Sequence, residues 1–288
     1  MAVTGQATRN ARPLEPFGVE LQIDLRRGPS ADDADALRKA FATHDLVLLR
    51  DQQLSMDEQI RACERIGPVL LSDSGVMSRH TVIGLAGVEL CFHSDYGYSP
   101  EPLQAISLLA TDVVDGETST RFAGGRRAHE QLRDDVRDRV ASRRALQVFG
   151  ARLDRRNRRA ELDPRLPSTA HPIVWPHDAT GGSFLFAPEM TTDSIEGLDP
   201  EESEELIGAL FQALYSDENV LEHRWSTGDL IVWNNVSVVH ARGDVSELER
   251  RVLQRVTLGT KGYLDLYPEL ANFEWDARGT MVEGDAFA

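Results

Sequence analysis

The segment His93-Ser-Asp95 places an imidazole and a carboxylate two residues apart in strand-like sequence. Residues two apart on a strand project from the same face, so both side chains can reach one metal ion. A second imidazole, His240, follows a buried strand expected at Leu230–Trp233 and lies in an apolar run. Each histidine has an ordinary alternative: His93 as a surface residue beside a solvated aspartate, and His240 as a hydrogen-bonded core residue.

Two arginines, Arg251 and Arg255, alternate with apolar residues in a strand expected at Val252–Leu258, so they share one face. An inward-facing arginine is costly unless an anion pairs with it; an internal Asp or Glu, or simple surface exposure, is the alternative. Two histidines and one carboxylate leave three metal positions open, which is the ligand set of non-haem Fe(II) oxygenases. An arginine adds bidentate recognition of the far end of a dicarboxylate.

Short strands predominate among the elements that must position these residues, which predicts a mainly β fold with peripheral helices (α+β), a sandwich or barrel. The helical pattern predicts helices at Ala31–His44, Ser55–Ile66, Arg126–Ser142 and Glu201–Tyr215. Strands are expected at Val19–Leu25, Leu46–Leu49, Thr81–Leu85, Glu89–His93, Ala105–Ala110, Ala145–Phe149, Pro172–Trp175, Ser183–Phe186, Val220–Trp225, Leu230–Trp233 and Val252–Leu258. Because no Gly-rich loop follows a strand, a dinucleotide or P-loop site is not expected.

Net charge is the most informative feature of the composition: 31 Lys+Arg against 47 Asp+Glu give −16 over 288 residues. Such a surface repels phosphate backbones and anionic lipid, so neither nucleic-acid nor membrane partners are expected. Only two cysteines, Cys63 and Cys91, are present, which fits a reducing cytoplasm. The first residues lack the apolar core of a signal peptide. We expect a disordered arm at residues 1–13 and a single domain over 14–288.

The ordered set of motifs resembles the taurine dioxygenase-like (TauD/TfdA) family of Fe(II)/2-oxoglutarate-dependent dioxygenases, from Val19 to about Gly259. The resemblance is carried by His93–Pro102, Thr120–Ala123, His171–Val174, Gly228–Asn235, and His240 with Arg251 and Arg255.

The resemblance implies a double-stranded β-helix (jelly roll, cupin-like) with helices outside. It implies that His93, Asp95 and His240 are the catalytic metal site, holding Fe(II). Thr120 and Arg251 would bind the 2-oxoglutarate carboxylate distal to the metal. Arg255 would lie nearer the iron, against the other end of the cosubstrate or an anionic substrate. The implied reaction consumes O2, releases succinate and CO2, and hydroxylates an unactivated C–H bond of a small molecule; desaturation, epoxidation or cyclisation are alternative outcomes.

This sequence departs from the family pattern at several points. The usual Gly-Gly-x-Thr spacing before the cosubstrate threonine is loosened here to Gly116-Glu-Thr-Ser-Thr120, which makes Thr118 a rival for the role of Thr120. A Trp-Asp-Asn motif appears as Trp233-Asn234-Asn235, and the substrate loop over Ser72–Glu89 is compact. Arg250 precedes Arg251, but alternation favours Arg251 as the inward residue. The presence of Asp95 argues against the halogenase variant of the family.

The substrate is not defined by these motifs. Aromatic and apolar residues near them give expected pocket walls, at Met77, Phe92, Tyr96, Tyr98 and Phe186. The Arg-rich segment Ala151–Arg165 could attract an anionic or carrier-tethered substrate, or pair with the acidic surface of the protein itself. Family resemblance also makes a homodimer or homotetramer an expectation.

Two other classes compete with this interpretation. One is a cupin-like zinc or manganese enzyme, for which Cys91, two residues before His93, could be a further ligand. The other is a non-catalytic jelly-roll binding protein. Neither gives Arg251 and Arg255 a role.

Overall fold

A large sheet forms one half of the computed structural model, which describes residues 11–26, 28, 30–71, 76–77, 88–248, 250–275 and 281–283. Its strand order is β1-β2-β3-β14-β6-β16-β4, antiparallel except for the β2–β3 pair. The strands are β1 (Ala11–Pro13), β2 (Val19–Leu21), β3 (Leu46–Leu49), β4 (Val76–Met77), β6 (Ala105–Val113), β14 (Leu230–Asn234) and β16 (Arg251–Leu258).

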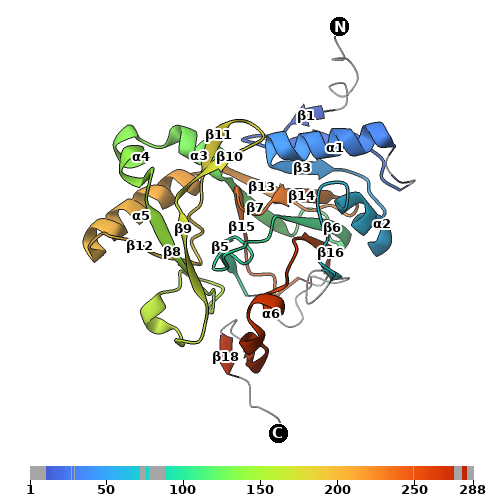
Figure 1. The fold of residues 1–288 in the computed structure, drawn as a ribbon. Helices are drawn as coiled ribbons and strands as arrows, with labels where there is room; N and C mark the ends of the chain where they lie inside the picture. Colours follow the sequence, from blue (N-terminus) through green and yellow to red (C-terminus); the bar gives the residue numbers. More distant parts are fainter. Residues whose placement is uncertain are drawn as a thin grey trace.

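A four-stranded antiparallel sheet, in the order β13-β7-β15-β5, packs against the large sheet (Figure 1). Its strands are β5 (Leu90–His93), β7 (Ser119–Gly124), β13 (Val220–Arg224) and β15 (Val238–Arg242). One apolar core joins the two sheets, and Phe122 of β7 meets Trp233 of β14 edge to face at 5.2 Å. The mainly β architecture predicted from the sequence is therefore confirmed.

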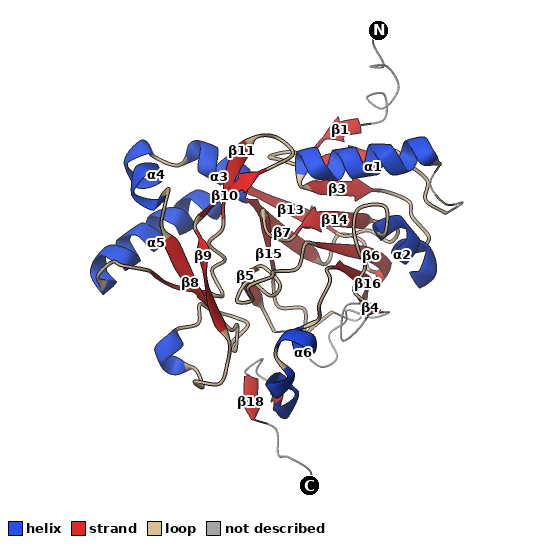
Figure 2. Cartoon of the chain, viewed as in Figure 1, coloured by secondary structure: helices blue, strands red, loops and turns tan. Residues whose placement is uncertain are grey.

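Helices α1 (Ala31–His44) and α2 (Met56–Cys63) cover the outer face of the large sheet (Figure 2). Both begin with a capping box, in which Ser30 and Ser55 bond to the backbone of the third helical residue. The bounds predicted for α1 are confirmed. Helix α2 ends three residues before the expected Ile66.

A second group of helices shares a separate apolar core: α3 (Gly125–Gln131), α4 (Asp134–Val140) and α5 (Pro200–Leu214). The prediction of one helix over Arg126–Ser142 is wrong, because Leu132 adopts an extended conformation. The Arg137 guanidinium donates to the carbonyl oxygens of Leu132 at 2.6 Å and Glu130 at 3.2 Å, and so satisfies the exposed end of α3.

Smaller sheets complete this side of the molecule. They consist of β8 (Arg144–Val148), β9 (Ser168–Pro172) and β12 (Thr192–Ile195), and of the hairpin β10 (Val174–His177) with β11 (Gly182–Leu185). The strand expected over Pro172–Trp175 is thus divided between β9 and β10. The strand expected over Val19–Leu25 stops at Leu21, and the amide of Leu25 donates to the Gln52 side chain instead of a ladder partner.

The C-terminal segment was not predicted to form elements. It contains α6 (Tyr263–Leu266), the 3-10 helix η2 (Pro268–Asn272), β17 (Phe273–Trp275) and β18 (Met281–Glu283), and a further 3-10 helix, η1, lies at Arg159–Glu161. None of the described helices is long and apolar enough to cross a bilayer. Of the expected arm at residues 1–13, the described part is β1, which pairs with β2. The strand expected at Thr81–Leu85 lies outside the described residues.

Replacing Phe122 with alanine tests the contact between the sheets. The ring is fully buried, so Phe122→Ala is expected to lower the free energy of unfolding by about 3–5 kcal/mol. Leu71→Ala is the control, because that side chain is 71% exposed and its loss should change stability by less than about 0.5 kcal/mol. Equal effects in urea denaturation would contradict the proposed packing.

Candidate active site

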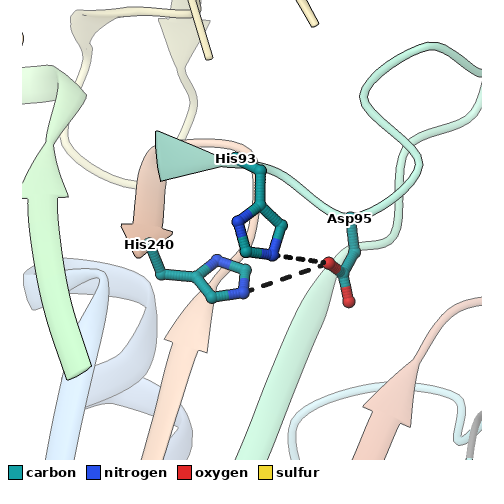
Figure 3. A group of neighbouring side chains, drawn as sticks. All are labelled: His93, Asp95 and His240. Carbon is teal, nitrogen blue, oxygen red and sulfur yellow. Dashed lines mark ion pairs between the residues drawn. The ribbon is translucent and has the colours of Figure 1, made fainter. Parts of the chain in front are cut away.

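The two histidines and the aspartate singled out in the sequence come together at one end of the four-stranded sheet (Figure 3). His93 is the last residue of β5, and its cross-strand partner in β15 is His240. The Nε2 atoms of His93 and His240 lie 3.4 and 3.9 Å from Oδ1 of Asp95. His240 follows β14, as expected, and lies within the next strand, β15, where its pairing with β5 brings the two histidines together.

Contrary to the expectation from the sequence, Asp95 does not lie on the same strand as His93. Strand β5 ends at His93, so Asp95 lies in a turn, followed by Tyr96 with a left-handed φ of 58°. The buried Asn235 side chain holds this turn: its Oδ1 accepts from the Asp95 amide at 2.9 Å, and its Nδ2 donates to the Asp95 carbonyl at 2.9 Å. Asn235 also bonds to Ser94 and to the Leu103 carbonyl.

The donor atoms fit a single metal ion. All three lie within 4.8 Å of one another, and donors bound to one ion at about 2.1 Å are themselves about 3 Å or more apart. Nδ1 of His93 lies 2.9 Å from the Cys91 carbonyl. Since a carbonyl can only accept, Nδ1 carries a proton, which leaves Nε2 as the ring nitrogen available to a metal.

Cys91 does not belong to the donor group found among the described residues. Its side chain packs with Leu153 and Met190, and burial raises the pKa of the thiol well above its ordinary value. The zinc alternative therefore lacks the cysteine ligand that it invoked.

A cavity of about 390 Å³ opens beside the three donors. Much of its wall is apolar, contributed by Leu90, Phe149, Leu153, Met190, Leu270 and Phe273. Its charged lining residues are one carboxylate and three arginines: Asp95, Arg242, Arg251 and Arg255. The site is thus positive in a protein of net charge −16.

Arg255 lies against the donor group, since its Nη2 donates to Oδ2 of Asp95 in a very short contact. Burial by itself would raise the pKa of Asp95. The Arg255 charge and the two histidines outweigh that effect, so the pKa lies well below its ordinary value. The carboxylate is therefore ionised and oriented before a metal binds.

Arg251 is the first residue of β16, four residues before Arg255, and is 3% exposed. Its Nε donates to Oγ1 of Thr118 at 2.9 Å. Burial, followed by the charge of Arg242, lowers the pKa of Arg251 to about 9, so the side chain is still charged at neutral pH. Arg250 is exposed and pairs with Asp112 at 3.3 Å, which confirms Arg251 as the inward residue.

The rival threonines occupy different positions. Thr118 orients Arg251, whereas Thr120 lines the cavity and accepts a 3.0 Å bond from Nε1 of Trp225. Asn234 stands where the family motif has aspartate. Its Oδ1 accepts hydrogen bonds from the amides of residues 236 and 237, and so holds the turn between β14 and β15.

The expected pocket walls are only partly correct. Tyr96 and Tyr98 line the cavity, but Phe92 and Phe186 do not. Phe92 points to the other side of β5 from His93 and stacks on Tyr215 at 4.4 Å. The side chain of Met77, and most of Ser72–Glu89, lie outside the described residues.

The Arg-rich segment Ala151–Arg165 pairs with the protein itself. Arg156 and Arg158 both bond to Glu204 on α5, at 2.8 and 2.7 Å. Arg165 pairs with Asp163 at 2.7 Å. These pairings favour the structural interpretation of the segment over a docking role.

Residues that sequence reasoning missed include Arg242 and the C-terminal pair Leu270 and Phe273. Arg242 had a detectable signal, because it stands two residues after His240 on one strand. The C-terminal pair had none, since long-range packing alone brings it to the cavity.

Comparison with known proteins places this geometry in a family. The profile described as "Taurine catabolism dioxygenase TauD, TfdA family" matches residues 10–257. The chain belongs to this family. It is therefore an enzyme of the 2-oxoglutarate-dependent dioxygenase class, which uses 2-oxoglutarate and O2. The resemblance seen in the sequence is confirmed.

Individual relatives agree with this family assignment. The chain is 28% identical to an alpha-ketoglutarate-dependent 2,4-dichlorophenoxyacetate dioxygenase of Cupriavidus pinatubonensis, over 86% of this chain and 96% of that protein. It is 29% identical to pentalenolactone F synthase of Streptomyces arenae, over 60% and 63% of the two chains. A taurine dioxygenase structure from Burkholderia xenovorans superposes with a TM-score of 0.72 at 23% identity, covering 96% of each chain. This likeness confirms the jelly-roll fold.

Replacing Asn235 should loosen the metal group specifically. Asn235→Ala leaves buried polar partners unsatisfied, so we expect about 3 kcal/mol lower stability and roughly 10–100-fold weaker Mn(II) binding by calorimetry. The control is Asn219→Ala, because Asn219 is equally buried and bonds to the carbonyls of Gly124 and Leu214 away from the cavity. Stability should fall there while Mn(II) affinity is retained. Equal metal affinity in both variants would contradict the positioning role.

Proposed function

We propose that this dioxygenase hydroxylates a C–H bond of a small acidic molecule, with release of succinate and CO2. In this proposal His93, Asp95 and His240 hold Fe(II), and Arg251 and Thr120 bind the distal carboxylate of 2-oxoglutarate. The observation that carries it is the convergence of three metal donors on the wall of a positively charged cavity. A 2-His-1-carboxylate set with open positions is typical of non-haem Fe(II) oxygenases.

Bound iron would supply the redox chemistry that couples decarboxylation of 2-oxoglutarate to substrate oxidation. The residues of the chain orient the groups that would bind the metal. Arg255 keeps the Asp95 carboxylate ionised and oriented, and the Cys91 carbonyl fixes the tautomer of His93. The apolar wall limits water around the reacting groups.

Charge and size support an acidic substrate with an apolar body. Three arginines and one carboxylate line the cavity, and bound Fe(II) would add two positive charges, so the site would stay positive with the dianionic cosubstrate bound. At about 390 Å³ the cavity is at the small end of ligand pockets, so both ligands must be compact. The relative named for 2,4-dichlorophenoxyacetate supports an aryloxy acid as the first class to test.

We also propose that the enzyme is cytoplasmic, has a single domain over residues 14–288 and forms a homodimer or homotetramer. Both cysteines are free and buried, which supports a reducing compartment.

Anaerobic spectroscopy tests the cofactor assignment. Adding Fe(II) and 2-oxoglutarate to the wild-type enzyme should produce the weak visible charge-transfer band of the chelate. The band should require far more 2-oxoglutarate in Arg251→Ala, because a buried charge-assisted contact is lost. Arg250→Ala is the matched control, since its neighbouring guanidinium is exposed. A wild-type enzyme that gives no band would refute the proposal.

Turnover tests the substrate class. Succinate release should be stimulated by small aryloxy or other apolar carboxylic acids and not by their uncharged amides, because only the acids match the positive charge of the site. Sulfonates, amino acids and natural-product acids complete the panel, and mass spectrometry of the product distinguishes hydroxylation from desaturation, epoxidation or cyclisation. Equal stimulation by acids and amides would contradict an acidic substrate.

A further inference from the structure

Arg242 is a buried arginine of the cavity that the proposed mechanism does not use. It is the last residue of β15, lines the cavity and is 5% exposed. Its Nη2 donates to the Val88 carbonyl at 2.7 Å, while its Nε is buried without a hydrogen-bond partner among the described residues. A buried guanidinium nitrogen without an acceptor is costly and calls for a ligand.

No carboxylate of the described residues forms an ion pair with Arg242. Asp95 is engaged by Arg255. Asp244, two residues beyond Arg242, is exposed; its charge favours the charged form of Arg242, but burial outweighs this effect and lowers the pKa of the guanidinium. Arg242 nevertheless acts on its buried neighbour Arg251, whose pKa is lowered by burial and then by the charge of Arg242. Two buried like charges close enough to interact are stabilised when an anion binds between them.

Strand register places Arg242 at the cosubstrate end of the cavity. In the β7–β15 pairing, His240 is opposite Phe122 and Ala241 is opposite Arg121, where the pairing ends. Arg242 follows Ala241 and Thr120 precedes Arg121, so both residues belong to this end of the two strands, while on its other side Arg242 pairs with Leu90 of β5 after a register shift. Thr120 lines the same cavity. The neighbours of Arg242 are therefore the residues that the proposed function assigns to the distal carboxylate.

Dimensions agree with this placement. Arg242 lies two residues from His240, or about 7 Å along the strand. The two carboxyl carbons of extended 2-oxoglutarate are separated by four C–C bonds, about 5 Å by extended-chain dimensions. A cosubstrate held at the metal group by one end can thus bring its other end to Arg242.

We propose that Arg242 is a second arginine for the distal carboxylate of 2-oxoglutarate, which it binds together with Arg251. This inference rests on the proposed function. Each guanidinium would donate to the carboxylate, and Thr118 and the Val88 carbonyl would hold the two side chains in place. A carboxylate flanked by two guanidinium groups explains why the cavity contains an arginine beyond Arg251 and the Asp95-paired Arg255.

Calorimetric titration of the Mn(II)-loaded enzyme tests this role with two ligands. 2-Oxoglutarate has the distal carboxylate, and 2-oxovalerate has the same chain length with a methyl group there. Arg242→Gln should weaken 2-oxoglutarate binding by at least about tenfold, since charge-assisted hydrogen bonds are lost. Binding of 2-oxovalerate should be unchanged within about twofold. Arg242→Lys should restore part of the preference for 2-oxoglutarate, and Arg250→Gln is the exposed control.

The ratio of the two dissociation constants separates binding from folding, because a destabilised variant loses affinity for both ligands alike. An unchanged ratio in Arg242→Gln would overturn the proposal. The proposal would also be overturned if the affinity for 2-oxoglutarate were retained and only the KM of an acidic substrate rose. That outcome would assign Arg242 to the substrate. Failure of the wild-type enzyme to bind 2-oxoglutarate would instead refute the proposed function itself.

Discussion

The cross-strand pairing of His93 with His240 is the contact on which the rest of the site depends. It fixes the register of β5 on β15, brings the two imidazole centroids to 4.1 Å and directs both Nε2 atoms at Asp95. A slip of one residue would turn either ring to the opposite face of the sheet. The surrounding core can therefore be understood as the structure that holds this register. Phe122 is the partner of His240 on β7, Trp233 contacts the His240 ring at 4.9 Å, and the two aromatic rings pack the sheets together.

Charge in this protein is divided between surface and cavity. The chain is strongly acidic as a whole, yet the cavity presents three arginines and a single aspartate. The low-dielectric wall makes these few groups dominate the local field, so net charge says little about the ligand. One arginine, Arg255, serves the metal group. Arg251 and Arg242 remain for the dianionic cosubstrate, which couples cosubstrate binding to the relief of repulsion between them.

Sequence reasoning identified the donor residues because their types are chemically rare and their spacing is local. It placed α1 to the residue, since a capping box and an apolar stripe are both local signals. It failed at the break at Leu132, whose carbonyl is satisfied by the Arg137 side chain, and at the turn that carries Asp95, which is held by Asn235, 140 residues away in the sequence. Cavity walls from distant segments, such as Leu270, have no local signal at all.

One metal ion and 2-oxoglutarate are expected to share this cavity. Anomalous diffraction from crystals grown with Mn(II) and the cosubstrate analogue N-oxalylglycine tests it most directly. We expect one manganese peak bonded to Nε2 of His93, Nε2 of His240 and the Asp95 carboxylate, with the distal carboxylate of the analogue between Arg251 and Arg242. A fully occupied peak elsewhere, or an analogue bound away from these arginines, would contradict it.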